Sequence, residues 1–209
     1  MLQNMVDEPR SRRAEYAEQT KQAILAAAAD SFLNKGYGET ALDDVGRVAR
    51  VSKGAVYHHF DDKPGLFEAV FESRCGAALE AIVDLMPEES SPREAIHGAI
   101  AAVFNAYETD SKLRELSRQA GQAMGEDRRR EVQQRKSFPF VLSIFENAAA
   151  NGSLREGIDV TIAARMALEL VFDGAVMYAA DLERPGYREQ MEQVLVAMVT
   201  GLLSDGDTA

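Results

Sequence analysis

The 209-residue sequence has no tryptophan, one cysteine and only six prolines. The single cysteine, Cys75, excludes an internal disulfide and a zinc site built from cysteines. Its expected role is that of a small apolar residue on a helix. Long stretches without proline are rich in alanine, leucine, glutamate and arginine, which favour helix. The composition therefore predicts an all-α protein.

Long hydrophobic runs are also missing. The first twenty residues are polar and charged, unlike a secretory signal. The longest apolar stretch, near residues 163–180, is interrupted by Arg165, Glu169 and Asp173, which excludes a membrane span. We therefore expect a cytoplasmic protein with no membrane partner.

An excess of positive charge is the third absence. The net charge of −11 argues at first against nucleic acid as a partner. The charge is uneven, however, because residues 1–75 hold 10 Lys and Arg against 12 Asp and Glu, a balance of −2, whereas the remainder carries −9. The first part can therefore still present a locally basic face.

Helix signals recur along the whole chain. Thr20 opens a helix that runs to about Lys35, and Gly36 follows where a left-handed residue is wanted. Thr40 is expected to cap a second helix, and Ser52 a third, very short one. The remaining segments give about nine helices in total, at about 62–86, from the Ser91 capping box through Tyr107, and at about 112–124, 127–150, 159–181 and 187–203.

The second and third helices have the spacing of a helix-turn-helix. On a helical projection, Val56 and Phe60 point inward. The outward positions are Gly54, Ala55, Tyr57 and His58, with Lys53 and His59 on the flanks. Small residues beside hydrogen-bond donors and rings suit close approach to a DNA major groove.

A metal site is the alternative interpretation of the same stretch, because His58, His59, Asp61 and Asp62 are possible ligands. Two ligands on one helix normally lie four residues apart, whereas adjacent histidines diverge by about 100°. Asp62 is expected to cap the fourth helix instead. We therefore expect no metal and no cofactor.

The string TALDDVGRVARVSKGAVYHHFDDKPGLF resembles the DNA-binding module of the TetR (tetracycline-repressor) family, and the dense match covers about 20–71. The resemblance implies an N-terminal three-helix helix-turn-helix domain followed by a larger helical ligand-binding and dimerisation domain. Arg50 departs from the family pattern, since glycine is common there and a left-handed backbone would strain it. Gly46 replaces an alanine and still lets the second and third helices approach closely.

The resemblance implies that Tyr57, His58 and His59 contact DNA and that Lys63 meets a phosphate. His58 is the best candidate for reading a base edge, and Tyr57 for bonding a phosphate. With the helix starts added, the candidate DNA-binding residues are Thr40, Ser52, Lys53, Gly54, Ala55, Tyr57, His58, His59 and Lys63. The expected domains are a flexible arm at 1–19, the DNA-binding domain at 20–65, and the ligand-binding and dimerisation domain at 66–209.

The last two helices have apolar sectors wider than packing on one neighbour requires, which predicts a homodimer interface. The candidate interface residues are Ala167, Val171, Gly174, Tyr178, Val194, Met198 and Leu202. On the opposite side of the penultimate helix, three charged residues lie four positions apart: Arg165, Glu169 and Asp173. They are expected to form a solvated ladder, a row of charged side chains exposed to water.

An effector cavity is expected in the second part. Its candidate lining residues are Phe104, Tyr107, Met124, Phe138, Phe145, Met166 and Met177. Pro139 should kink its helix and open space there. Methionine and phenylalanine suit a small lipophilic or aromatic ligand.

These features predict a transcriptional regulator, most simply a repressor that binds a palindromic operator as a homodimer and is released by a small molecule. An activator, or a non-enzymatic small-molecule-binding or protein-interaction module with weak DNA binding, remains the alternative. No nucleophile–base pair, paired acids or phosphate loop indicates an enzyme.

Overall fold

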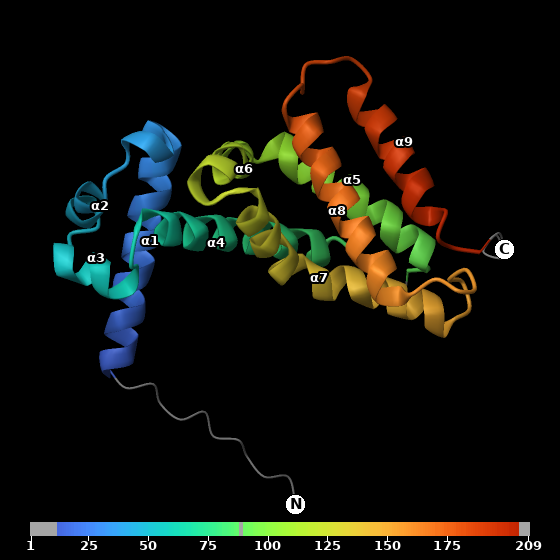
Figure 1. Ribbon diagram of the computed structural model, residues 1–209, viewed down its shortest axis with the longest axis horizontal. Coiled ribbons are helices and arrows are strands. Elements are labelled where there is room, and N and C mark those ends of the chain that lie inside the picture. Colours follow the sequence, from blue (N-terminus) through green and yellow to red (C-terminus); the bar gives the residue numbers. More distant parts are fainter. Residues whose placement is uncertain (1–11, 88–89, 205–209) are drawn as a thin grey trace, which may run out of the picture. The chain divides into compact units, whose positions relative to one another are not determined.

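The computed structural model describes residues 12–87 and 90–204, and this part of the chain consists of helices joined by turns and loops (Figure 1). Its helices are α1 (Arg12–Glu39), α2 (Leu42–Val48), α3 (Lys53–His59), α4 (Lys63–Asp84), α5 (Pro92–Thr109), α6 (Ser111–Met124), α7 (Glu126–Ala150), α8 (Val160–Ala179) and α9 (Tyr187–Thr200). The prediction of an all-α chain with about nine helices is confirmed. Internal contacts divide the chain into two units, one up to Val70 and one from Phe71.

The start of α1 corrects one expectation. Helix α1 begins at Arg12, so residues 12–19, expected in a flexible arm, are helical; residues 1–11 lie outside the described part. The segment RRAEYAEQ consists mainly of good helix formers but has no buried stripe, so the search for apolar periodicity gave no signal. Gly36 has a positive φ of 82°, as its place after Lys35 predicts.

The first unit is built around three aromatic rings. The Phe32 and Phe67 ring centroids lie 5.0 Å apart, and those of Tyr37 and Phe67 lie 5.5 Å apart, both edge to face. Such pairs add to the stabilisation from apolar burial. The core is completed by Ile24, Ala28, Val45, Val56, Phe60 and Leu66, all buried. This core joins α1 and the start of α4 to α2 and α3.

The turn between α2 and α3 has the geometry that its unusual residues predict. Arg50 adopts φ 57°, the one positive φ at a non-glycine residue in the described chain. A Cβ at Gly46 would lie 3.1 Å from Val56 Cγ2, so α2 and α3 meet where a larger side chain would crowd them. The strained arginine and the close approach were both predicted from sequence, and both are confirmed.

The second unit is a bundle in which α5 contacts α7, α8 and α9, and α8 packs on α7 and α9. Ser91 and Glu94 form the predicted capping box at the start of α5, with Pro92 in the first turn. Helices α8 and α9 lie side by side, as Figure 1 also shows in orange and red. In the described ranges, no helix is both long and apolar enough for a membrane span.

Candidate DNA-binding surface and internal cavity

Helix α3 has a buried side and an exposed side. Val56 and Phe60 are buried, whereas Gly54, Tyr57 and His58 are exposed. Ser52 Oγ accepts a hydrogen bond of 3.1 Å from the Ala55 amide and is the N-cap that the sequence predicted. Because the N-cap and the two buried residues fix the helix, its outward side chains form a preorganised surface.

We call this surface the α3 face and define it by Ser52, Lys53, Gly54, Ala55, Tyr57, His58 and His59. Ala55 and His59 are half-buried and the others are exposed. The His58 and His59 rings lie edge to face, with centroids 5.3 Å apart. No group of three or more histidine, cysteine or acidic side chains able to hold a metal occurs in the described residues.

Lys53 is held by its neighbours on the α3 face. Its Nζ donates to Asp43 Oδ2 at 2.8 Å and lies 5.7 Å from the centroid of the Tyr57 ring. The hydrogen bond to Asp43 raises the pKa of Lys53, so the ammonium stays charged. The contact is exposed, and a phosphate can replace the Asp43 carboxylate as the acceptor.

Thr40 is not placed as the sequence suggested. The N-cap of α2 is Ala41, which makes no side-chain capping bond. Thr40 is buried, and its hydroxyl donates to the Gly36 carbonyl at 2.8 Å. The helix begins one residue later than expected, because the turn after α1 uses the Thr40 hydroxyl for its own carbonyl. The expectation that Thr40 caps α2 is therefore wrong.

Lys63, the candidate phosphate ligand at the start of α4, is engaged with α1. Its Nζ donates to the carbonyls of Tyr37 at 2.8 Å and Gly38 at 3.1 Å, and lies 4.5 Å from the centroid of the Tyr37 ring. An ammonium has three donors, so one more acceptor can still bind. Asp62 Oδ1 accepts from the Gly65 amide at 2.7 Å and caps α4, as predicted.

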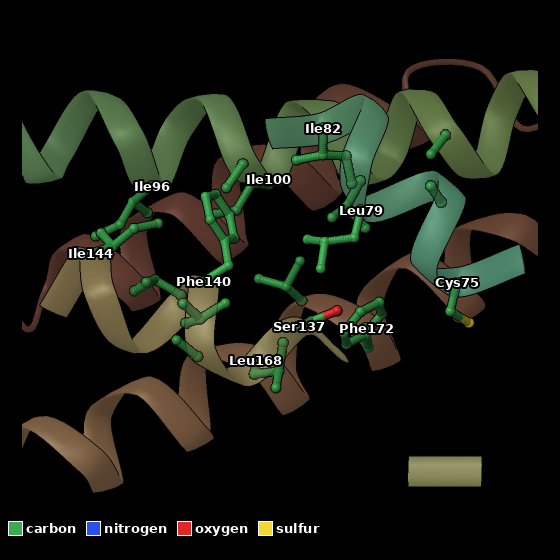
Figure 2. A pocket seen from close by; sticks show the side chains of 18 of the residues that line it. Cys75, Leu79, Ile82, Ile96, Ile100, Ser137, Phe140, Ile144, Leu168 and Phe172 are labelled. Atoms are coloured by element: carbon green, nitrogen blue, oxygen red, sulfur yellow. The ribbon is translucent and has the colours of Figure 1, made fainter. Parts of the chain in front are cut away.

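The second unit contains an apolar cavity of about 80 Å³ (Figure 2). Its walls come from α4, α5, α6, α7, α8 and α9. The lining includes Leu79, Ile82, Ile96, Ile100, Val103, Phe140, Val141, Ile144, Phe145, Leu168 and Val171, with Cys75, Tyr107 and Ser137 as its polar members. No lining residue carries a formal charge.

Two of the seven candidate lining residues, Tyr107 and Phe145, do line this cavity. The remaining five, Phe104, Met124, Phe138, Met166 and Met177, do not. Phe104 is buried against Tyr178 instead, with ring centroids 5.2 Å apart. The Phe138 ring centroid lies 5.1 Å from Arg165 Cζ. These five residues do not line this cavity, because residue type alone does not distinguish a cavity wall from the solid core.

Helix α8 exposes a different set of apolar residues from the one expected. Met166 and Met177, expected to face inward, are 55% and 58% exposed. Ala167, Gly174 and Tyr178, expected at an interface, are buried inside the unit. Ala167 and Val171 line the cavity. The width of the apolar sector was correct, but the sequence pattern does not indicate which edge of the sector faces the core.

We call the exposed apolar residues of the last two helices the α8–α9 face: Ile162, Met166, Met177, Val194 and Met198. Val194 and Met198, both named from the sequence, are 56% and 51% exposed. Leu202, the seventh interface candidate, is half-buried. Exposed methionine and branched aliphatic side chains on neighbouring helices are typical of a surface that another chain covers.

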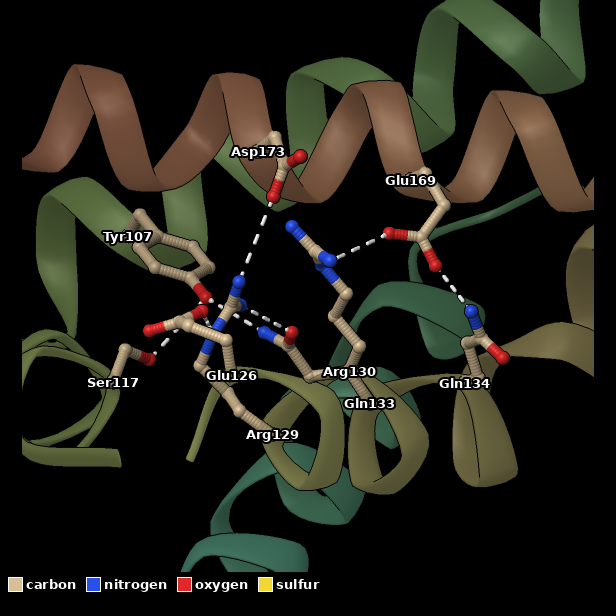
Figure 3. Close-up of polar contacts among 9 residues, drawn as sticks. All are labelled: Tyr107, Ser117, Glu126, Arg129, Arg130, Gln133, Gln134, Glu169 and Asp173. Atoms are coloured by element: carbon tan, nitrogen blue, oxygen red, sulfur yellow. Dashed lines mark hydrogen bonds and ion pairs between the residues drawn. The ribbon is translucent and has the colours of Figure 1, made fainter. Parts of the chain in front are cut away.

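A buried polar network adjoins the cavity at Tyr107 (Figure 3). Tyr107 Oη lies 3.3 Å from Ser117 Oγ and accepts a hydrogen bond of 3.4 Å from Gln133 Nε2. Gln133 Oε1 in turn accepts from the buried Arg129 guanidinium at 2.7 Å. Burial raises the pKa of Tyr107 to about 12, so its hydroxyl remains protonated. The Tyr107 ring forms part of the wall while its hydroxyl is already engaged.

The expected solvated ladder on α8 makes contacts with α7. Asp173 lies 3.6 Å from Arg129 Nη2, and Glu169 accepts a hydrogen bond from Gln134 (Figure 3). Arg165 Nη1 donates to Gln134 Oε1 at 3.1 Å. These side chains therefore hold α8 to α7 instead of serving only as a hydrated surface.

The cavity residues that α4 contributes were not identified from the sequence, nor was Ser137 of α7. Cys75, Leu79 and Ile82 recur at helical spacing, and that stripe was an available signal. Ser137 lies three residues before Phe140 and seven before Ile144, on the apolar side of α7. A polar residue in an apolar stripe marks a place where a hydrogen-bonding group faces the interior.

The comparison with known families agrees with the α3 geometry. Residues 24–70 match the family model of bacterial regulatory proteins, tetR family. This segment of the chain is therefore similar to the DNA-binding part of the TetR family. The repressor BepR of Brucella suis biovar 1 is 30% identical to this chain over 104 residues, 49% of each protein. The chain thus spans about half the length of the first curated relatives that it matches.

Two further similarities extend over most of this chain. The repressor KstR2 of Mycolicibacterium smegmatis is 25% identical over 223 aligned positions, 99% of this chain and 98% of KstR2. The crystal structure of RolR with resorcinol has a TM-score of 0.70 and 18% identity, covering 89% of this chain and 90% of RolR. At that identity, the structural likeness shows the fold of the aligned part alone.

Proposed function

We propose that this chain is a transcriptional regulator that binds operator DNA through the α3 face and responds to a small apolar molecule. The observation that carries the proposal is the α3 face itself, where a capped seven-residue helix turns Tyr57 and His58 outward with Val56 and Phe60 buried behind them. Within this role, His58 reads a base edge while Tyr57 and Lys53 bind phosphates. Thr40 is not part of this proposal because it is buried. The role is non-enzymatic.

We further propose that the chain acts as a homodimer joined through the α8–α9 face. A dimer presents two copies of α3, and two copies related by a twofold axis match a palindromic site. The exposure of Met166, Met177, Val194 and Met198 supports this pairing. Three buried residues of α8 pack inside the unit and hold in place the helix that carries the interface: Ala167, Gly174 and Tyr178.

The effector site that we propose is the cavity of the second unit. RolR, whose structure contains resorcinol, is a protein of similar fold with a small aromatic ligand. At about 80 Å³ the cavity is smaller than an engineered cavity of about 150 Å³ that holds benzene. A ligand must therefore move the wall, and α4, which supplies part of that wall, is continuous with the first unit. This movement is the proposed link between ligand and DNA binding.

The test is the affinity for DNA fragments selected from a random pool by the purified chain. Replacing His58 with alanine should weaken binding to the selected site about tenfold to hundredfold, because one base contact is lost. His97 is exposed on α5, so His97→Ala is the matched control and should leave affinity unchanged. Binding that falls equally in both variants, or in neither, would contradict the assignment of α3.

A further inference from the structure

The cavity wall contains one hydroxyl that the protein does not use. Ser137 is 6% exposed, and the chain provides no hydrogen-bond partner for its side chain among residues 12–87 and 90–204. Buried polar side chains are hydrogen-bonded in the large majority of cases. Because Ser137 lines the cavity, its hydroxyl is accessible to a molecule that enters there. The unused hydroxyl therefore requires an explanation.

Several other helical hydroxyls of this chain bond to their own helix. Ser31 donates to the Ala27 carbonyl at 2.8 Å, and Thr200 donates to the Val196 carbonyl at 2.7 Å. Ser143, on the same helix as Ser137, donates to the Phe140 carbonyl at 2.7 Å. Ser137 makes no such bond although the carbonyl four residues earlier is available to any helical serine. Its hydroxyl lies among the hydrocarbon side chains of the lining (Figure 2).

The other polar members of the wall are poor partners for a ligand. The Tyr107 hydroxyl is already engaged by Ser117 and Gln133. Burial raises the pKa of the Cys75 thiol to about 12, so it stays neutral, and a thiol is only a weak donor. The remaining wall is hydrocarbon and carries no charge that could compensate an ionised ligand.

We infer that the effector is an uncharged, mainly hydrocarbon molecule whose one hydroxyl or carbonyl group hydrogen-bonds Ser137. This inference rests on the proposed function and names the ligand class of the same cavity. It excludes carboxylates and ammonium ions as the buried head group, because the wall offers neither a charged partner nor several hydrogen bonds.

A set of four one-ring probes separates these requirements on the full chain. Toluene, benzyl alcohol, benzoate and benzylammonium share the ring and differ in the head group. By calorimetry or ligand-observed magnetic resonance, benzyl alcohol should bind about threefold to tenfold more tightly than toluene, as one net hydrogen bond provides. The two ions should bind at least about 100-fold more weakly than benzyl alcohol.

Two serines of α7 make the matched comparison. Ser137→Ala should reduce the affinity for benzyl alcohol to that for toluene and leave toluene unchanged. Ser143→Ala, which removes an exposed hydroxyl from the same helix, should change neither. Val103→Phe fills the cavity and should weaken both neutral probes at least about tenfold. If that variant does not fold, the ratio between the two serine variants still decides.

Several outcomes would overturn the inference. An unchanged preference for benzyl alcohol in Ser137→Ala would mean that the hydroxyl serves only a water or the helix. Preference for an ion, or no binding of any probe at millimolar concentration, would equally contradict it. A failure of the proposed function would appear in a different measurement, the DNA affinity of the unliganded chain, which does not depend on these probes.

Discussion

The two units of this chain use their sequence in opposite ways. The first unit places its distinctive side chains outside, on a seven-residue helix held by a serine cap and two buried residues. The second unit encloses its distinctive site, where six helices together contribute the apolar residues of one cavity. Surface chemistry can therefore be assigned from one helical period, whereas a cavity depends on how several helices pack together.

The thiol in the cavity wall gives the largest expected effect. Burial raises the pKa of Cys75 from 9.0 to about 12, with the Glu72 charge adding to the shift. At pH 8 the thiolate fraction should be about 1000-fold lower in the folded chain than in urea, so alkylation by iodoacetamide should be much slower in the folded chain. The chain has no other cysteine, so mass spectrometry reports this site alone. Similar rates in both states would show that the second unit is open at this wall.

The sign of the accompanying stability change follows from the same shift. A group whose folded pKa is raised contributes stability below its unfolded pKa and loses it as the pH rises towards the folded value. The free energy of unfolding should therefore fall between about pH 9 and 12, and Cys75→Ala should reduce that fall. An identical pH profile in the variant would contradict the burial of the thiol.

The α8–α9 face gives the next effect. Glutamates at both Val194 and Met198 would bury two charges in an apolar contact, so this double variant should be monomeric by sedimentation velocity. Its affinity for a palindromic operator should fall at least about 100-fold, because a single α3 loses half of the contacts. Val83→Glu changes an exposed residue of α4 and should remain dimeric. Dimerisation that persists in the double variant would place the interface elsewhere.

Two lysines of the first unit separate structure from DNA contact. Lys63→Met removes an ammonium that holds two carbonyls of α1 and the turn, so unfolding by urea should become easier by about 1.5–3 kcal/mol. Lys53→Met breaks only an exposed ion pair and should change stability less. If Lys63→Met were as stable as Lys53→Met, the two hydrogen bonds from Lys63 to carbonyls would not contribute to stability. Binding a phosphate would then be the one remaining role for Lys63.

The strained turn gives the smallest effect. Arg50→Gly relieves a left-handed backbone at a cost in chain entropy, so the free energy of unfolding should rise by about 0.5–1 kcal/mol. Arg47→Gly, inside α2, should lower it by about 1 kcal/mol. Thermal unfolding of the pair measures both signs. Equal destabilisation by the two glycines would show that the Arg50 conformation is not strained.

The sequence predicted the turn and the third helix of the first unit closely, because the signals for both are local. The Ser52 cap, the inward Val56 and Phe60 and the left-handed Arg50 each depend on neighbours within a few positions. Thr40 was misassigned because its hydroxyl can either cap α2 or bond the Gly36 carbonyl at the end of α1. Only the three-dimensional path of the chain decides between these two partners. The start of α1 at Arg12 was missed because it has no buried stripe.

In the second unit the sequence predicted the helices but not which side of each helix faces the core. The residues of α8 that it assigned to the interface and to the cavity were partly exchanged, since Met166 and Met177 are exposed while Ala167 is buried. Small residues face inward there because α8 packs closely on its neighbours, and the flexible methionines remain outside. Ser137 can be recognised as a cavity residue only when the positions of all six lining helices are known.

The most direct test of the central claim is operator affinity measured by fluorescence anisotropy with and without a neutral cavity ligand. The account predicts that the chain binds its selected palindrome at least about 1000-fold more tightly than scrambled DNA, with affinity that falls steeply as salt rises. Saturating benzyl alcohol should change that affinity in the wild-type chain and leave Val103→Phe unaffected. Equal affinity for the two DNAs, or the same ligand response in both proteins, would contradict it.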